Sequence, residues 1–379
     1  MLTMRRIASH YALINGALER GIVVEVDDHG TITNISRHDS IDNIANVEFY
    51  PGILIPGMIN AHSHLELAYL RGAIAEGTGF AGFAREIGRV RGNYTNEERL
   101  HAASVADSEM WYEGVEAVMD IANDDLVMPI KERSKVEYHT LFEVFGLTAQ
   151  SCDTQRAMAS KYGHADITTH STYSLQDGIF RDIAKEGRES LSVHLLESED
   201  EIALYNKKGA LWEWYTRMGW ECDFLHYGHP AKRIAESVPT TRRTILVHGC
   251  KSTAEDISLL DRHFDIQPTW VLCPESNRYI SGITPPVTLY REMGAQIAIG
   301  TDSLASARHL SMVENMRLLG DVPLAELLTY ATLNGAKALG IAERKGSIEV
   351  GKQPGLAVIS GVDMQSMRLT AESASRRIM

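Results

Sequence analysis

The stretch that decides the fold of this chain is residues 54–67, LIPGMINAHSHLEL. A short apolar run, residues 54–59, contains a Pro-Gly step and leads to two histidines, His62 and His64, with one serine between them. In an extended strand, residues i and i+2 point to the same face. The segment therefore predicts a buried strand that ends by presenting two imidazoles side by side.

Further β-rich runs follow this strand along the chain. We expect strands at residues 115–121, 138–145, 166–170, 191–196, 244–248, 269–272 and 296–299. Most of these runs are apolar almost throughout, as is typical of parallel strands covered on both faces. Helical patterns separate them, so the alternation predicts an α/β fold, a (β/α)8 TIM-like barrel. A doubly wound open sheet is the rival, weakened as a nucleotide binder because no G-x-G-x-x-G or P-loop follows any strand.

The two ends of the chain have a different pattern. Residues 8–50 alternate apolar and polar positions around Asn-Gly and Asp-His-Gly turns, which is typical of β-hairpins, and residues 346–360 do the same. We expect the two ends to pair into a small β-sandwich domain of residues 1–53 and 345–379. The barrel domain would then span residues 54–344.

Composition narrows the class of partner. The 379 residues carry a formal net charge of −13, which argues against nucleic acid or an anionic membrane as the main partner. The four cysteines form no C-x-x-C pair, so a reducing compartment is expected. The first residues lack the apolar core of a signal peptide, and no run approaches the roughly 18 apolar residues of a membrane span. We therefore expect a cytoplasmic protein that acts on a small molecule.

Metal-binding residue types recur at the carboxyl ends of the predicted strands, which meet at one mouth of a barrel. In chain order they are His62, His64, His170, His194, His248, Cys273 and Asp302, with Glu197 three residues after His194. Imidazole and carboxylate ligands favour Zn²⁺ or Fe²⁺ over Mg²⁺ or Ca²⁺. A single histidine after a strand is more often structural, Asp302 could cap a helix, and Glu197 could be a first-turn acid. Their joint occurrence at the strand ends favours a metal site.

Several short motifs strengthen this interpretation. They are PGMINAHSH (56–64), HLLE (194–197), VHGC (247–250), CPESN (273–277), GTDSLAS (300–306) and the tail GSIEVGKQPG (346–355). With these motifs the chain resembles the amidohydrolase superfamily, in the branch of cytosine deaminases, adenosine deaminases and chlorohydrolases. The resemblance covers nearly the whole chain.

The resemblance implies a role for each of the central residues. The implied metal ligands are His62, His64, His194 and Asp302. The implied catalytic residues are Glu197, which moves a proton from the attacking water to a ring nitrogen; His248, which orients that water; and Asp302, which also accepts a proton from it. The predicted strand at 166–170 has no lysine to bridge two ions, which favours one divalent metal, Zn²⁺ with Fe²⁺ as the alternative.

Contacts with the substrate are expected from loops around the mouth. The candidates are Glu66, His170, Tyr173, Asn277 and Ser303. His170 and Tyr173 lie in HSTYS (170–174), which resembles a substrate-contacting segment of nucleoside-type deaminases. For Glu66 a surface salt bridge is an equal alternative. The glycine-rich segment 70–90 is a candidate lid.

The predicted function is hydrolytic deamination of an amino-substituted purine, pyrimidine or adenosine-like nucleoside, a set that includes amino-deoxyfutalosine. A chlorohydrolase or a cyclic amidase of the same superfamily is the alternative enzyme. A non-catalytic binding protein on the same fold is the alternative from another class. A homodimer is what the resemblance implies about assembly.

Overall fold

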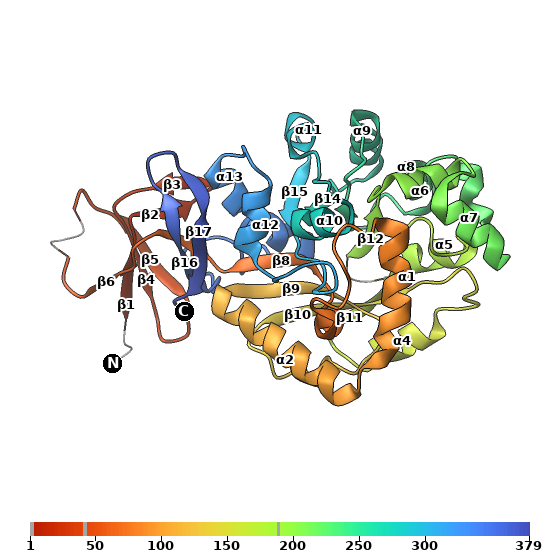
Figure 1. Ribbon diagram of the computed structural model, residues 1–379. Helices are drawn as coiled ribbons and strands as arrows, with labels where there is room; N and C mark the ends of the chain where they lie inside the picture. Colours follow the sequence, from red (N-terminus) through yellow and green to blue (C-terminus); the bar gives the residue numbers. More distant parts are fainter. Residues whose placement is uncertain (1–3, 41–43, 188–189) are drawn as a thin grey trace.

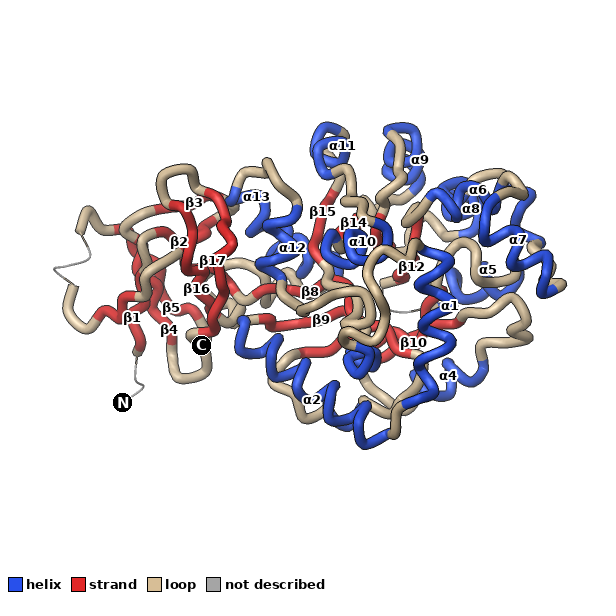
Figure 2. The backbone as a smooth tube through the Cα atoms, viewed as in Figure 1, coloured by secondary structure: helices blue, strands red, loops and turns tan. Residues whose placement is uncertain are grey.

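A closed barrel of parallel strands forms the larger part of the molecule. The structure is a computed structural model, and it describes residues 4–40, 44–187 and 190–379. Within these residues, two four-stranded parallel sheets have the orders β11-β10-β9-β8 and β12-β13-β14-β15. Parallel bridges at Ser63–Asp302 and Ser171–His194 join the sheets along both edges. The predicted (β/α)8 TIM-like barrel is confirmed (Figures 1 and 2). Its strands are β8 (Met58–Ser63), β9 (Val115–Ala122), β10 (Glu137–Val144), β11 (Ala165–Thr169), β12 (Leu191–Leu195), β13 (Thr244–His248), β14 (Thr269–Leu272) and β15 (Gln296–Ile299).

Helices surround these strands, as Figure 2 shows for α2 along one side of the barrel and α9 and α11 on the other. Helix α2 begins with a capping box, in which Thr95 and Glu98 satisfy each other's backbone N–H groups, and ends at Gly114 in the left-handed conformation. The helices are α1 (Phe80–Val90), α2 (Asn96–Glu113), α3 (Met128–Lys131), α4 (Asp153–Ala159), α5 (Asp177–Glu186), α6 (Glu199–Tyr205), α7 (Gly209–Met218), α8 (Pro230–Ser237), α9 (Ala254–His263), α10 (Pro274–Ser281), α11 (Val287–Glu292), α12 (Met312–Leu318), α13 (Leu324–Thr329) and α14 (Gly335–Leu339).

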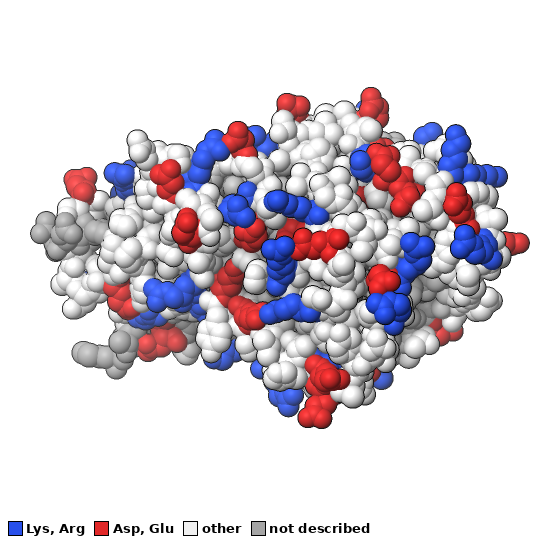
Figure 3. Space-filling model, viewed as in Figure 1, with Lys and Arg blue, Asp and Glu red and all other residues white. Residues whose placement is uncertain are grey.

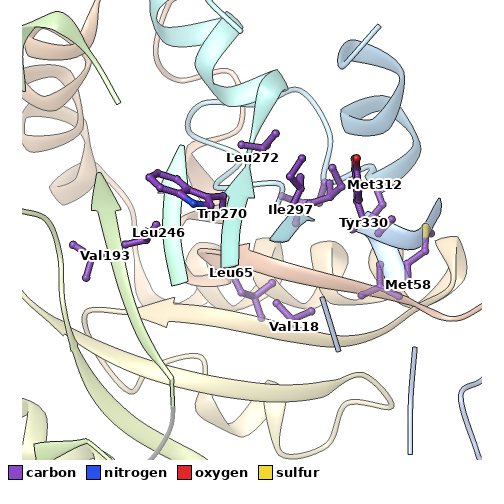
Figure 4. Packing of buried hydrophobic residues seen from close by; sticks show 14 of the residues in the cluster. Met58, Leu65, Val118, Val193, Leu246, Trp270, Leu272, Ile297, Met312 and Tyr330 are labelled. Atoms are coloured by element: carbon purple, nitrogen blue, oxygen red, sulfur yellow. The ribbon is translucent and has the colours of Figure 1, made fainter. Parts of the chain in front are cut away.

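Side chains alternate between two apolar cores along the barrel strands. On β13 and β14, Leu246 and Trp270 are paired neighbours that face the surrounding helices, as Figure 4 shows. The intervening Val247 and Val271 belong to a second buried cluster, which fills the barrel itself. Because both faces are apolar, the strands are buried on both sides and the barrel is a packed core with its polar residues at the strand ends.

The first predicted strand, residues 54–59, is wrong in its boundaries. The chain forms two strands here. β7 (Ile53–Pro56) pairs with β2 and β16 in a sheet outside the barrel, and β8 is the first strand of the barrel. Gly57 lies between them. Glycine is required at this position, because a Cβ atom would lie 2.0 Å from Cγ of Glu116. The predicted domain boundary after residue 53 therefore cuts β7, and the change from one sheet to the other occurs at Gly57.

Both ends of the chain contribute to the two sheets outside the barrel, which have the orders β5-β4-β1-β6 and β17-β16-β7-β2-β3 in the described residues. Ile7, Val24, Leu54 and Leu356 come from both sheets and pack into one buried cluster, so the sheets form a β-sandwich. The C-terminal hairpin spans β16 and β17 rather than residues 346–360. The strands are β1 (Arg5–Ala8), β2 (Tyr11–Ile14), β3 (Ala17–Glu19), β4 (Ile22–Val26), β5 (Ile32–Arg37), β6 (Val47–Phe49), β7 (Ile53–Pro56), β16 (Leu356–Asp363) and β17 (Arg368–Arg377).

Charged side chains of both signs are mixed over the face shown in Figure 3. Among the helices that the structure describes, none combines the length and the apolar character needed to cross a membrane. The predicted metal-binding and catalytic residues lie at or near the carboxyl ends of the barrel strands, at the mouth of the barrel.

Candidate active site

The two edges where the barrel closes lie at the predicted site residues themselves. On one edge, the carbonyl oxygen of His62 accepts the N–H groups of Thr301 at 3.0 Å and Asp302 at 3.1 Å. On the other edge, the carbonyl oxygen of His170 accepts the N–H of His194 at 2.9 Å. The hydrogen bonds that close the barrel therefore hold the ends of β8, β11, β12 and β15 beside one another.

Three buried histidines converge at this mouth. The Nε2 atoms of His62 and His64 lie 3.2 Å apart, and one ring nitrogen each from His62, His64 and His194 lies within 4.8 Å of the others. Nδ1 of His194 lies 2.7 Å from the carbonyl oxygen of His170, so this nitrogen carries the proton and Nε2 has a free lone pair. Nδ1 of His62 and Nδ1 of His64 have no hydrogen-bond partner among the described residues.

The protonation states of this cluster suit a cation. Burial, with the neighbouring imidazoles, holds the pKa of His62 and of His194 well below the usual value, so both rings are neutral, the form that binds metals. Two nitrogens on one tetrahedral zinc ion, each at roughly 2.05 Å from it, would lie about 3.4 Å apart, close to the spacing of His62 and His64. The donor set therefore fits one divalent metal ion.

Asp302 adds a carboxylate next to these histidines. Its Oδ1 lies 3.6 Å from Nε2 of His64, and its Oδ2 accepts hydrogen bonds from Ser276 at 2.5 Å and Ser306 at 3.1 Å. Burial favours the neutral acid, but His64, His248 and the Ser276 hydroxyl outweigh it and lower the pKa of Asp302. Ser276 and Ser306 lie within the CPESN and GTDSLAS motifs, yet sequence reasoning gave them no role.

Ser303, a predicted substrate contact, lies behind this carboxylate. Its hydroxyl is 3.3 Å from the hydroxyl of Ser306, which in turn donates to Asp302. Ser303 is 2% exposed. The structure therefore connects Ser303 to the residues that hold Asp302.

Glu197 and His248 face each other beside the histidine cluster. Nε2 of His248 lies 3.8 Å from Oε1 of Glu197, and Nδ2 of Asn277 donates to Nδ1 of His248 at 3.0 Å, which leaves the imidazole proton on Nε2. Burial, with the charges of Asp302 and Glu201, raises the pKa of Glu197 well above its usual value. Glu197 therefore keeps its proton to a higher pH than an exposed glutamate does. Asn277 is a predicted substrate contact. In the structure, its side-chain amide contacts His248 and orients that imidazole.

The backbone at three strand ends adopts the left-handed conformation without glycine. Leu196, His248 and Asp302 have φ values of 52°, 76° and 58°. Such positions cost free energy and persist where the surrounding structure fixes them, and they concentrate at functional sites. Each one turns the chain just where a predicted site residue leaves its strand.

Glu66 is buried, at 1% exposure, so the surface salt bridge is wrong. Its Oε2 accepts the backbone N–H groups of Asn123 at 2.9 Å and Asp124 at 3.2 Å, just after β9. Burial is the main reason why its pKa rises to about 7. The structure thus gives Oε2 of Glu66 the loop after β9 as its contact, and a contact of Glu66 with the substrate stays a prediction.

His170 and Tyr173 lie on the side of the mouth next to His194. The His170 ring stacks on that of His194, with centroids 4.6 Å apart, and burial lowers the pKa of His170 to about 3. The Tyr173 ring packs edge-on against Phe80 of α1, 5.5 Å away, and its hydroxyl has no hydrogen-bond partner in the described residues. The segment 70–90 therefore covers Tyr173, and its movement as a lid stays a prediction.

The structure thus brings histidines and acids together at the mouth of a closed (β/α)8 barrel. The family model described as the amidohydrolase family matches residues 53–375, and the chain belongs to this family. The resemblance inferred from the motifs is confirmed.

Known proteins similar to this chain include deaminases, and its structural neighbours also include an atrazine chlorohydrolase of Arthrobacter aurescens (TM-score 0.74, 16% identity, 96% of this chain and 90% of that chain). An adenosine deaminase of Helicobacter pylori is 26% identical over 89% of this chain and 84% of its own length. The structure is similar to that of H. pylori aminofutalosine deaminase in complex with methylthio-coformycin (TM-score 0.80, 24% identity, 97% of this chain and 93% of that chain). It is also similar to an adenosine deaminase of Xanthomonas campestris with bound zinc (TM-score 0.75, 22% identity, 98% and 89%).

Proposed function

We propose that this protein is a metal-dependent deaminase that hydrolyses the exocyclic amino group of an adenosine-like substrate and releases ammonia. The observation that carries the proposal is the position of Glu197, a buried acid beside the His62–His64–His194 cluster and outside it, 3.8 Å from Nε2 of His248. A structural metal site needs no such acid, whereas deamination of an aromatic ring needs a proton donor for the ring nitrogen. The deaminase names of the similar proteins support an adenosine-like substrate.

In this proposal one zinc ion is held by His62, His64, His194 and Asp302. When bound, such an ion lowers the pKa of a water molecule from 15.7 to about 7 and so supplies hydroxide at neutral pH. Zinc is preferred to iron because the similar X. campestris protein was solved with zinc. The homodimer and the cytoplasmic location stay predictions, to be checked by light scattering and by cell fractionation.

The chain's own residues then move the protons. Glu197 donates its proton to the ring nitrogen next to the carbon that loses the amino group, which draws negative charge away from that carbon. His248 donates from Nε2 and so orients the incoming oxygen nucleophile, and Asn277 keeps this tautomer in place. Asp302 accepts a proton through its carboxylate. Water and the amino compound are consumed, and the oxo compound and ammonia are formed.

The test is ammonia release by the zinc-loaded protein from adenosine, 5′-methylthioadenosine, cytosine, guanine and an amino-s-triazine. We expect turnover of the adenosine-like compounds and none by Glu197→Gln. Chloride release from a chlorinated triazine, or ring opening of a cyclic amide, without ammonia from any amino compound would contradict the proposal.

A further inference from the structure

Glu143 is a buried acid at the barrel mouth with no place in the proposed reaction. It lies near the end of β10, two residues after Leu141, whose side chain belongs to the cluster inside the barrel. Residues i and i+2 share a face, so Glu143 also points inward, and it is only 4% exposed. Its position two residues before the end of the predicted strand 138–145 is the sequence signal for it.

One side of the Glu143 carboxylate is held by a relay of buried groups. Glu66 accepts the backbone N–H of Asn123 at 2.9 Å, and Nδ2 of Asn123 donates to Oε1 of Glu143 at 2.5 Å. Oε2 of Glu143 is buried and has no hydrogen-bond partner in the part of the chain that the structure describes. Buried carboxylate oxygens are costly unless they are paired, so a fixed carboxylate with one free oxygen indicates a missing partner.

A second metal ion is one candidate for that partner. One ligand atom each from Glu143, His170 and His194 lies within 4.8 Å of the others. Nδ1 of His194 already donates to the carbonyl oxygen of His170, so its single free lone pair is the one that faces His62 and His64. Without His194, only Glu143 and His170 remain, fewer than the three protein ligands of a catalytic zinc site.

The hydrogen bonds of His170 point to a different ligand. Ser171 donates its hydroxyl proton to the hydroxyl oxygen of Ser174 at 2.9 Å, and Ser174 Oγ lies 3.2 Å from Nδ1 of His170. We assign the remaining Ser174 proton to a hydrogen bond with Nδ1 of His170. The imidazole proton then lies on Nε2. A carboxylate oxygen of Glu143 and a ring nitrogen of His170 lie within 4.8 Å of each other. A hydroxyl group, which donates one hydrogen bond and accepts others, complements a carboxylate acceptor and an N–H donor at this spacing.

We propose that Glu143 and His170 bind one hydroxyl group of the sugar of the substrate, and that the relay from Glu66 through Asn123 fixes the acceptor. This inference rests on the proposed function, since it assumes an adenosine-like substrate. Under this proposal, Glu143 on β10 and His170 directly after β11 make the protein prefer a nucleoside to a free base.

The experiment compares adenosine with 2′-deoxy-, 3′-deoxy- and 5′-deoxyadenosine on the zinc-loaded wild type and on Glu143→Gln. We measure dissociation constants by calorimetry and kcat/KM from ammonia release. For the wild type, one of the three deoxy compounds should be weaker than adenosine by roughly 10- to 100-fold, the value of one hydrogen bond to a charged group. Glu143→Gln should remove most of that difference, and Asn123→Ala should reduce it through the relay.

Glu137→Gln is the matched control, because Glu137 lies on the same strand at the other end and pairs with Arg344 and His139. It should keep the wild-type discrimination. An equal loss for all four nucleosides in Glu143→Gln, or a wild type that treats all four alike, would overturn the inference and leave the deaminase proposal standing. Two zinc ions per wild-type chain and one in Glu143→Gln would overturn it in favour of a second metal site.

Binding and turnover separate the two proposals. Nucleoside binding that discriminates hydroxyl groups without ammonia release would contradict the deaminase proposal and support the hydroxyl site. No binding of any of the four nucleosides would overturn both.

Discussion

The carbonyl oxygen of His62 accepts the backbone N–H of Asp302 at 3.1 Å, so two of the proposed metal ligands are joined through the hydrogen bond that closes the barrel. At the opposite edge, the carbonyl oxygen of His170 accepts the N–H of His194 at 2.9 Å, so barrel closure also holds a third proposed ligand, His194. The site is therefore assembled by barrel closure, and binding at the site should in turn stabilise the closed barrel.

Metal removal should lower the thermal stability of the protein. A ligand that binds only the folded state stabilises it by about 2.7 kcal/mol at a free concentration 100 times its dissociation constant. Chelation should therefore lower the Tm by several degrees, and added zinc should restore it, as measured by calorimetry. His194→Ala is the control: its Tm should respond little to the chelator, and an equal response would contradict the proposed ligand set.

Glu197→Gln should abolish most turnover while the metal stays bound. Loss of one proton-transfer group costs about 10²- to 10⁴-fold in rate. The readouts are kcat for ammonia release and the zinc content per chain. Full turnover by the variant would show that another group protonates the ring.

Ser276→Ala should weaken metal binding without removing a ligand. The Ser276 hydroxyl donates to Oδ2 of Asp302 at 2.5 Å, and partners of metal ligands typically contribute about 10- to 100-fold to metal affinity. Ser306→Ala, which loses the longer 3.1 Å bond, should have the smaller effect. Zinc affinities from competition with a chromogenic chelator measure both, and unchanged affinities would show that Asp302 is held without the serines.

The buried ion pair of Asp120 and Lys131 should be more sensitive to loss of one partner than of both. Lys131 is 2% exposed and Asp120 fully buried, and Oδ1 of Asp120 also accepts the N–H of Leu65, next to His64, at 2.7 Å. Lys131→Met leaves an unpaired buried charge and should cost about 3–5 kcal/mol of unfolding free energy. Adding Asp120→Asn should restore part of that loss.

Urea unfolding measures these free energies. Lys161→Met is the matched control, because its pair with Asp125 is 57% and 36% exposed and should be worth no more than about 1 kcal/mol. A double variant less stable than Lys131→Met would contradict the argument.

Glu113 should make the protein less stable as the pH rises. Burial, with the nearby charges of Glu275 and Glu109, raises its pKa in the folded state to about 7 from the usual 4.5, although Ser311 and the N–H of Met312 donate to it. The folded state thus holds a proton that the unfolded state releases, so its contribution is present below pH 4.5 and lost as the pH rises through 7. In Glu113→Gln, the unfolding free energy should fall less between pH 5 and pH 8. Parallel pH profiles for the two proteins would contradict this.

The strand pattern of the barrel could be predicted from the sequence because both faces of each strand are apolar. The runs at 244–248, 269–272 and 296–299 match β13, β14 and β15 residue for residue. The first strand was the exception, since the apolar run continues through Gly57 although the chain changes sheet there. Hydrophobicity marks a buried strand and does not say which sheet buries it.

Part of the candidate site could be predicted because residues of metal-binding or acid–base type lie at or near the carboxyl ends of the predicted strands. These residues are His62, His64, His194, Glu197, His248 and Asp302. The structure gives Glu66 and Asn277 buried partners that lie far away in the sequence, whereas the partner of Ser303 is Ser306, three residues along the chain. Glu66 contacts the loop after β9, and Asn277 contacts His248. Such a contact depends on which loops meet, which strand periodicity does not contain.

The sequence by itself determined the fold class and the residue types at the barrel mouth, because strand periodicity and side-chain chemistry are local properties. Only the tertiary structure decided how those residues divide the work. Closure of the barrel placed His62 against Asp302, left Glu197 buried outside the histidine cluster with a raised pKa, and left one oxygen of Glu143 without a partner in the described chain. The physical reason is that burial and hydrogen bonding depend on neighbours that strand closure brings together from distant parts of the chain.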